Sequence, residues 1–355
     1  MNKKYFSLLC VLLVVILVAG CTAPAPATPE QSGNEPEAEE APAPAVSFAG
    51  APIFIGQDEL WGIWYPNGEN VVTIGVINPT AALVPSSNAS NPIQGSYLVW
   101  TPDLTRADAE EAISHNITLF RRPLAEIEEL LSGAEIDANS NIVVYASDAP
   151  TWGARVVWHL RALGLNARYL DGGNGPWHDA NRPTGSSARL SDQAPQHEFH
   201  APNYNMSAFV ADLPDVLESV QNPDQYVILD ARSNSEFAGR RVGASSGAFG
   251  TGRIAGAVNV EWNRTLDADG MLLPEAKLKE LFAEVLDGRT IITYCQGGIR
   301  ASFAWMVLTY LGADVRVFDG SWIEWSYAAS TAGSFAQQAL ALEFTEEWTD
   351  NNGPI

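Results

Sequence analysis

Two stretches of the sequence, separated by about 150 residues, repeat the same pattern, and this duplication constrains the fold most strongly. The first covers residues 141–177 and the second covers 290–322. Each contains a β-branched run, a loop, a helix-like segment, a second short apolar run and an Asp-Gly pair, at Asp171 and at Asp319. A repeat of this length indicates two duplicated domains, because solenoid repeats are much shorter.

Each copy predicts the order strand, loop, helix, strand. Runs such as 141–145 and 290–294 are short and apolar on both faces, which suits a parallel sheet that is covered on both sides. The helical segments end at Gly164 and Gly312, where a left-handed C-cap is favoured. The alternation predicts an α/β fold of two doubly wound domains, each a parallel sheet flanked by helices.

The second copy carries further signals upstream of this pattern. Residues 226–230 predict another buried strand, and Ser233 with Glu236 forms a capping-box pattern that starts a short helix. Residues 276–286, which follow Pro274, predict an amphipathic helix.

Domain boundaries follow from composition. We expect the first domain over 50–186 and the second over 206–330. The stretch 187–205 lacks hydrophobic periodicity and is expected to be the linker, and residues 331–355 form an Ala- and Gln-rich C-terminal tail.

The N-terminus has the pattern of an exported lipoprotein. Lys3 and Lys4 precede an apolar stretch that is shorter than the roughly 20 residues of a membrane-spanning helix. Val-Ala-Gly before Cys21 resembles a bacterial lipobox, in which the Cys thiol accepts a lipid. We therefore predict a signal peptide over 1–20 and an extracytoplasmic protein that is anchored to the bacterial cell membrane by a lipid on Cys21. An ordinary signal peptide or a membrane anchor that contains Cys is the alternative.

The segment after Cys21 and the net charge of the chain limit the classes of partner that we expect. Residues 22–46 are rich in Pro, Ala and Glu and contain no Leu, Ile, Phe or Trp, so 21–49 is expected to be a disordered tether. The formal net charge of −22 repels phosphate backbones, which argues against nucleic-acid binding. An anionic substrate must therefore be held by local hydrogen-bond donors.

Three cysteines occur, Cys10, Cys21 and Cys295. Cys10 would leave with the signal peptide and Cys21 would carry the lipid, so Cys295 would be the one free thiol of the mature protein. No internal disulfide is then possible, although an oxidising compartment would permit one. A lone exported thiol is a liability unless it is buried or useful.

Cys295 lies where a parallel α/β sheet binds ligands, beyond the carboxyl end of a predicted strand and before a helix. Gly297 and Gly298 let successive backbone N–H groups turn toward one point, and the helix N-terminus adds to this anion-binding concavity. Such surroundings favour a nucleophilic thiolate. Arg300 either supplies a fixed cation or braces the loop through backbone carbonyls.

The chain resembles the tandem-domain rhodaneses, the thiosulfate and 3-mercaptopyruvate sulfurtransferases. The first half resembles the non-catalytic partner domain of that family, chiefly over 141–185. Four motifs carry the resemblance of the second half, in family order: Leu229-Asp230-Ala231-Arg232 with Glu236-Phe237, Gly252-Arg253-Ile254-Ala255-Gly256-Ala257-Val258-Asn259, the loop from Cys295 to Arg300, and Asp319-Gly320-Ser321-Trp322-Ile323-Glu324-Trp325.

The resemblance implies that Cys295 takes a sulfane sulfur from a small-molecule donor, becomes a persulfide and passes the sulfur to cyanide or a thiol. It implies no metal and no organic cofactor. Cys295, Arg300 and Asp230 are the expected catalytic residues. The expected substrate-binding residues are Gln296, Gly297, Gly298, Ile299, Arg232, Arg253 and Trp322. As alternatives, Asp230 and Arg232 pair to close the strand end, and Trp322 is a packing residue.

Three departures from the family pattern bear on this reading. Arg253 and Ala255 replace the usual His and Pro, and Gln296 and Gly297 stand where thiosulfate-type members often carry Arg and Lys, which leaves the donor open. In the first domain Ala146 aligns with Cys295, and Asp148 nearby would repel an anion. Without a thiol no persulfide forms there, so the first domain is expected to be structural.

Two other classes of function compete with this reading. Phosphatase loops place five residues between Cys and Arg, whereas four intervene here, which suits a sulfur atom better. A non-enzymatic lipoprotein that binds sulfur or acts as a tethered interaction module is the main alternative. The five histidines suggest no metal site, because only His197 and His200 are close in sequence and no Cys or acidic cluster accompanies them.

Overall fold

The structure is a computed structural model of the chain. All of the residues that it describes belong to the unit Ala45–Ile355. The described residues are 47, 49–64, 71–77, 91–100, 103, 105–106, 120–146, 148–240 and 248–331.

The first part of the chain, called the first repeat below, is built on a six-stranded sheet in the order β1-β7-β6-β2-β3-β8. Every neighbouring pair in this sheet is parallel. The strands are β1 (Phe54–Ile55), β2 (Val71–Ile77), β3 (Tyr97–Trp100), β6 (Asn141–Ala146), β7 (Asn166–Leu170) and β8 (Ala188–Arg189). The accompanying helices are α1 (Gln57–Trp64), α3 (Leu124–Leu131), α4 (Pro150–Ala162) and α5 (Gly175–Asp179). A separate antiparallel ribbon joins β4 (Thr105–Arg106) to β5 (Phe120–Arg121).

The second repeat is built on a five-stranded sheet in the order β11-β10-β12-β13-β9, and its neighbouring pairs are also parallel. The strands are β9 (Val210–Ala211), β10 (Tyr226–Asp230), β11 (Val258–Asn259), β12 (Thr290–Tyr294) and β13 (Val315–Phe318). The helices are α6 (Leu213–Gln221), α7 (Asn234–Phe237), α8 (Glu275–Leu281), α9 (Ile299–Tyr310) and α10 (Ser321–Thr331). Short 3-10 turns occupy Leu190–Asp192, Met206–Ala208 and Trp262–Thr265. The predicted fold class, two α/β domains with parallel sheets flanked by helices, is confirmed.

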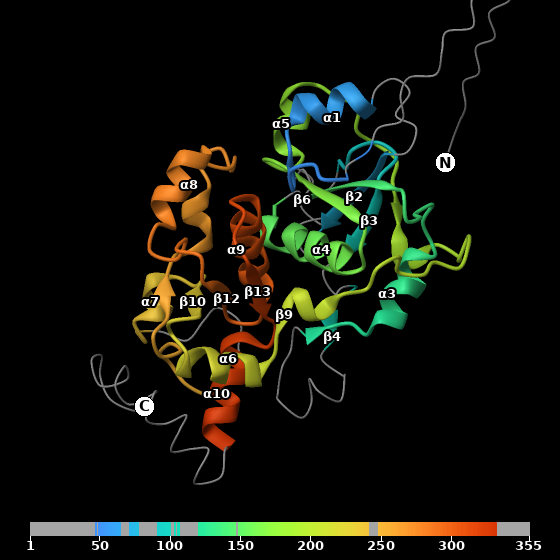
Figure 1. Cartoon of the computed structure of the whole chain (residues 1–355). Coiled ribbons are helices and arrows are strands. Elements are labelled where there is room, and N and C mark those ends of the chain that lie inside the picture. The colour runs from blue at the N-terminus through green and yellow to red at the C-terminus, as the bar shows by residue number, and fades with distance from the viewer. Residues whose placement is uncertain are drawn as a thin grey trace, which may run out of the picture. The chain divides into compact units, whose positions relative to one another are not determined.

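The two repeats share one apolar core. Helices α4 and α9, one from each repeat, pack against each other (Figure 1). The largest cluster of buried apolar side chains includes Trp158 of α4 and Phe303 of α9. The Phe303 ring also makes an edge contact with Tyr169 of the first sheet, with 6.2 Å between the ring centroids. Burial of this shared surface stabilises both repeats together.

Local signals in the sequence match the structure closely. The helices that precede Gly164 and Gly312 end with these glycines in the left-handed region, at φ of 88° and 81°. The Ser233 hydroxyl and the Glu236 carboxylate form the predicted capping box at the start of α7. The helix predicted over 276–286 is shorter, since α8 ends at Leu281 and turns follow it.

One part of the expected linker belongs to the first repeat. Strand β8 lies inside 187–205 and pairs in parallel with β3, where Tyr97 is opposite Ala188. Leu190 and Phe199 are buried in the shared core. A strand of two residues has no periodicity to detect, so only its pairing with β3 identifies it.

The predicted signal peptide, lipid site and most of the tether lie outside the described residues, as do residues 332–355 of the tail. Within the described part of the chain, no helix has the length and apolar character needed to cross a membrane.

Candidate active site

Cys295 directly follows β12 and precedes α9, at the carboxyl edge of the second sheet. Its backbone N–H donates to the hydroxyl of Ser321 (3.1 Å), and that hydroxyl donates to the Phe318 carbonyl (2.8 Å). The cysteine is a free thiol and only 1% exposed. The strand-to-helix turn therefore places Cys295 at the predicted edge of the sheet, but buried among apolar neighbours and not open to solvent.

Ser321 has an unusual backbone for a residue with a side chain, with φ of 52°. The equivalent position in the first repeat is Gly173, at φ of 64°, where a Cβ atom would lie 2.1 Å from the Ala146 carbonyl oxygen. A left-handed conformation is unfavourable for residues other than glycine. The second repeat keeps this conformation with a serine, whose hydroxyl bonds the Cys295 backbone.

In the loop that starts at Cys295, two backbone carbonyls accept hydrogen bonds, whereas two backbone N–H groups donate none to the described residues. Trp322 N–H donates to the Cys295 carbonyl and Ile323 N–H to the Gln296 carbonyl, each at 3.0 Å. Gly297 and Gly298 are buried, and within the described part of the chain their N–H groups donate no hydrogen bond. The first N–H groups of a helix also lack partners within the helix. Buried, unpaired donors of this kind are suited to an anion or a polarised sulfur.

Arg300, expected either to supply a fixed cation or to brace the loop through backbone carbonyls, pairs instead with a carboxylate. Its two terminal nitrogens each lie 2.9 Å from an oxygen of the buried Glu236. Burial would raise the pKa of Glu236, but the hydrogen bonds from Arg300 and Ser233 and the charge of Arg300 lower it to about 2. The pair ties the start of α9 to α7.

Asp230 and Arg232 close the end of β10, which was the alternative to a role in the substrate site. Both side chains are buried, and Arg232 Nη2 lies 2.6 Å from Asp230 Oδ2. The hydroxyl of Tyr294 donates to the same carboxylate at 2.6 Å and accepts from the N–H of Ile254 at 3.1 Å. The three side chains form a closed polar cluster at the end of β12, the strand that leads to Cys295.

Trp322 and Arg253, two further predicted substrate contacts, have partners within the fold. Trp322 is fully buried, its indole N–H donates to the Gly250 carbonyl (3.0 Å), and the Arg232 guanidinium lies 4.7 Å from its ring centre. The Arg253 guanidinium lies 4.5 Å from the ring centre of Phe237. Trp322 thus corresponds to the packing alternative.

The sequence reasoning missed a set of charges from the first repeat. Arg155 of α4 pairs through Nη2 with Asp319 Oδ1, and Arg121 of β5 lies 3.0 Å from Asp319 Oδ2. Burial would raise the pKa of Asp319, but the two guanidinium groups lower it overall. The available signal was Arg155, which stands between Ala154 and Val156 on the apolar part of a helix and so indicates a buried charge with a partner.

The counterpart loop of the first repeat has the expected composition. Ala146 ends β6, and Asp148, which follows it, is exposed. Among the residues that the structure describes, no group of His, Cys, Asp and Glu is arranged to hold a metal ion.

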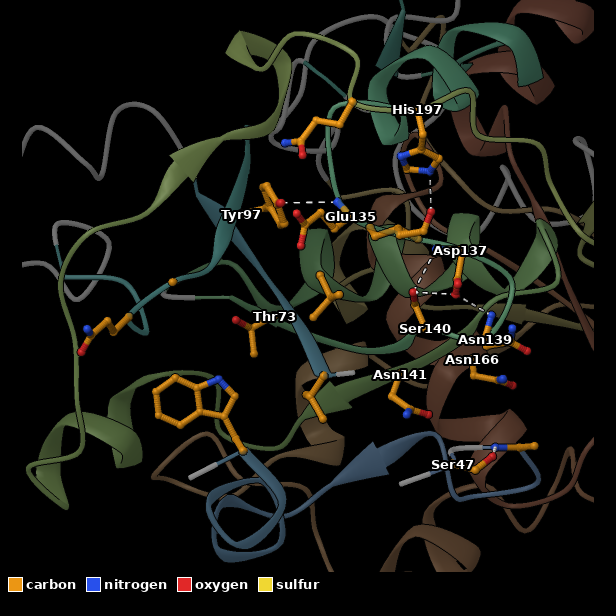
Figure 2. Close-up of a pocket in the computed structure, with 18 of the residues that line it drawn as sticks. Ser47, Thr73, Tyr97, Glu135, Asp137, Asn139, Ser140, Asn141, Asn166 and His197 are labelled. Carbon is orange, nitrogen blue, oxygen red and sulfur yellow. Dashed lines mark hydrogen bonds between the residues drawn. The ribbon is translucent and has the colours of Figure 1, made fainter. Parts of the chain in front are cut away.

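A cavity of about 1450 Å³ lies elsewhere, among residues of the first repeat and of the stretches just before and after it. Thr73, Tyr97, Asn141 and Asn166 line it near the amino ends of the strands, and Figure 2 shows their polar side chains around the space with His197. Ligand sites of open α/β sheets lie at the opposite, carboxyl ends of the strands. This cavity is therefore not the first-repeat counterpart of the Cys295 loop.

Comparison with known proteins agrees with this architecture. The family model described as a rhodanese-like domain matches residues 213–328. A thiosulfate sulfurtransferase of Corynebacterium glutamicum is 31% identical over 204 residues, which cover 56% of this chain and 67% of that protein. The sulfur carrier protein TtuD of Thermus thermophilus is 27% identical over 214 residues, which cover 56% of this chain and 73% of that protein.

Among solved structures, the Tum1 protein of Saccharomyces cerevisiae superimposes with a TM-score of 0.67 at 17% identity, covering 79% of this chain and 96% of Tum1. That likeness extends over both repeats and concerns the fold. The sequence relatives, the matched domain and the paired parallel sheets lead to one assignment: this chain belongs to the rhodanese family of sulfurtransferases.

Proposed function

We propose that the protein transfers a sulfane sulfur from thiosulfate or a related donor such as 3-mercaptopyruvate to cyanide or a thiol, through a persulfide on Cys295. With thiosulfate, the Cys295 thiolate attacks the outer sulfur, a new S–S bond forms, and sulfite leaves with the electron pair of the broken bond. The acceptor then attacks the outer persulfide sulfur, and Cys295 leaves again as a thiolate.

One observation carries this proposal. Cys295 begins a strand-to-helix loop in which Gly297 and Gly298 hold buried N–H groups that, within the described residues, have no acceptor. A buried N–H without a partner costs about 1–3 kcal/mol. A thiolate, a persulfide or a departing oxyanion would satisfy these donors, so the loop favours the charged states of the reaction.

The burial of Cys295 means that sulfur transfer requires a movement of the protein. With 1% of its surface exposed, the cysteine cannot meet a donor until the segments around it move. Reclosure after loading would exclude water and oxidants from the persulfide between the two half-reactions.

The proposal is tested by turnover. Purified protein that starts at residue 22 should form thiocyanate from thiosulfate and cyanide, and Cys295→Ala should form none. The same assay of wild type and Cys295→Ala with 3-mercaptopyruvate in place of thiosulfate shows which donor the protein uses. No thiocyanate from either donor with the folded wild-type protein would reject the enzymatic proposal.

A sulfur carrier is the second candidate function, favoured by the burial of Cys295 and by the similarity to a protein named as a sulfur carrier. A carrier would load one sulfur on Cys295 and keep it in the presence of cyanide. It would release the sulfur only to a protein thiol. Loading without turnover would therefore favour this candidate, which includes the non-enzymatic, membrane-tethered form.

The membrane attachment is a separate proposal that rests on the sequence before Cys21. The wild-type protein should partition into the detergent phase of cell extracts, and Cys21→Ser should move it to the aqueous phase. If both behave alike, Cys21 does not carry the lipid.

A further inference from the structure

Arg155 belongs to the repeat without a cysteine, yet its guanidinium reaches the other repeat. The side chain is fully buried and pairs with Asp319 at the end of β13. Its Nη1 and Nε atoms are also buried, and within the described part of the chain they have no hydrogen-bond partner. Buried donors normally find an acceptor. Because Nη1 and Nε of Arg155 find none among the described residues, the packing around the side chain must fix the orientation of its guanidinium.

The same guanidinium lies beside the Cys295 loop. A Cβ atom placed on Gly298 would lie 3.3 Å from Arg155 Nη1 and 2.7 Å from the Asp319 carbonyl oxygen. Gly298 is the residue before α9, with φ of 82°. Arg155 and Asp319 thus lie together against the backbone at Gly298, and their position requires glycine there.

The two repeats differ in the partners of the aspartate that follows the last strand of the repeated pattern, and this difference matches the presence or absence of the cysteine. Asp171, the counterpart of Asp319, accepts the N–H of Leu272 from the second repeat at 2.8 Å. Burial raises the pKa of Asp171, and backbone hydrogen bonds from Leu272 and Gly172 oppose that rise, whereas Arg155 and Arg121 lower the pKa of Asp319. Among the described residues, a pair of arginines therefore contacts the aspartate beside the cysteine-bearing loop and not its counterpart.

We propose that Arg155 is a positioning residue for the Cys295 loop, so that the repeat without a cysteine completes the active site of the other. Asp319 holds Arg155 beside Gly298, and Arg155 itself does not contact the donor. The inference rests on the proposed sulfur transfer at Cys295, because positioning matters only if the loop reacts.

Steady-state kinetics with thiosulfate and cyanide test the inference in the soluble mature chain. Arg155→Met removes the charge and the contact with Gly298, and it should lower kcat about 10- to 100-fold while KM for thiosulfate stays within about twofold, since small misplacements of reacting groups carry penalties of this size. Arg155→Lys keeps a charge for Asp319 and should recover part of kcat.

Arg121→Met is the matched control. It removes a cation from the same carboxylate in the same repeat, but Arg155 is the arginine beside Gly298. Its kcat should stay within about threefold of wild type. Equal losses in Arg155→Met and Arg121→Met would reduce Arg155 to an interface residue. A raised KM with unchanged kcat would mean a direct contact with the donor, and either result overturns the inference.

Hydrogen exchange of the free protein keeps the two proposals distinguishable. Backbone amides of Gly297 to Ile299 should exchange faster in Arg155→Met than in wild type and Arg121→Met, with no donor present. If wild type transfers no sulfur, the proposed function fails, while this comparison still decides whether Arg155 orders the loop. If Arg155→Met does not fold, the same two measurements on Arg155→Lys decide the inference, and wild-type kcat and exchange there would overturn it.

Discussion

At the scale of single residues, Ser321 shows most directly how the fold serves the cysteine. Its backbone takes a left-handed conformation, and its hydroxyl is the acceptor for the Cys295 N–H. Glycine would adopt this backbone freely but would lose the hydroxyl. The residue therefore combines a conformational cost with a hydrogen bond that fixes the start of the loop.

Two substitutions separate these contributions. Ser321→Ala keeps the strained backbone and leaves the buried Cys295 N–H unpaired, which should cost about 1–3 kcal/mol of unfolding free energy. Ser321→Gly loses the same bond but relieves the strain, so it should be about 1 kcal/mol more stable than Ser321→Ala. Urea denaturation measures both, and an alanine variant at least as stable as the glycine variant would show that the φ of 52° carries no strain.

Glu324 provides a pH-dependent test at the same scale. Burial, aided by the charges of Asp319 and Asp212, raises its pKa from 4.5 to about 7. Between these values the folded protein binds more protons than the unfolded chain, so the free energy of unfolding falls as pH rises through this window.

Glu324→Gln stays neutral and should not show this loss. The stability of wild type relative to the variant should fall between about pH 5 and pH 8 by at most about 3 kcal/mol, at about 1.4 kcal/mol per pKa unit. Urea denaturation at several pH values measures the difference. A difference independent of pH would contradict the raised pKa.

At the scale of elements, the strand-to-helix unit of β12 and α9 is held from outside by α7. Glu236 caps α7 and also accepts hydrogen bonds from both terminal nitrogens of Arg300 on α9. Because Glu236 is fully buried, its charge depends on that partner.

Arg300→Met should lower the free energy of unfolding by about 3–5 kcal/mol, because it leaves a buried carboxylate unpaired. Adding Glu236→Gln removes the charge while an amide can still cap α7, so the double variant should regain at least about 1 kcal/mol. A double-mutant cycle by urea denaturation measures this coupling. A double variant less stable than Arg300→Met would show that Glu236 does not need a cation.

The sequence allowed the elements and the Cys295 loop to be predicted, but not the side-chain pairs between residues far apart in the chain. Glycine C-caps, the capping box at Ser233 and the position of Cys295 depend on neighbours in the chain, so local patterns reveal them. The pairing of Arg155 with Asp319 joins residues 164 positions apart, and the Arg300–Glu236 pair joins residues 64 apart. Such pairs depend on how the elements pack, which a single sequence does not encode as a local pattern.

At the scale of the described molecule, the two repeats pack as one compact unit. Apolar side chains of both belong to a single cluster, and polar contacts cross between them in both directions, from Arg155 to Asp319 and from Leu272 to Asp171. The repeat without a cysteine therefore supports the other one and is more than a spacer.

Unfolding should accordingly be one cooperative transition. Phe303→Ala, which removes a fully buried ring at the contact of α9 with the first repeat, should cost about 3–5 kcal/mol and shift the whole transition. Tryptophan fluorescence and circular dichroism should report the same midpoint for wild type and variant alike. Two separated transitions in wild type would mean that each repeat folds independently.

The central claim is that Cys295 accepts a sulfane sulfur, and intact mass spectrometry tests it most directly. After incubation with thiosulfate and removal of the excess, wild type should gain the mass of one sulfur atom. Cyanide should remove that sulfur, and Cys295→Ala should gain none. An unchanged wild-type mass with thiosulfate and with 3-mercaptopyruvate, or an equal gain in Cys295→Ala, would contradict the account.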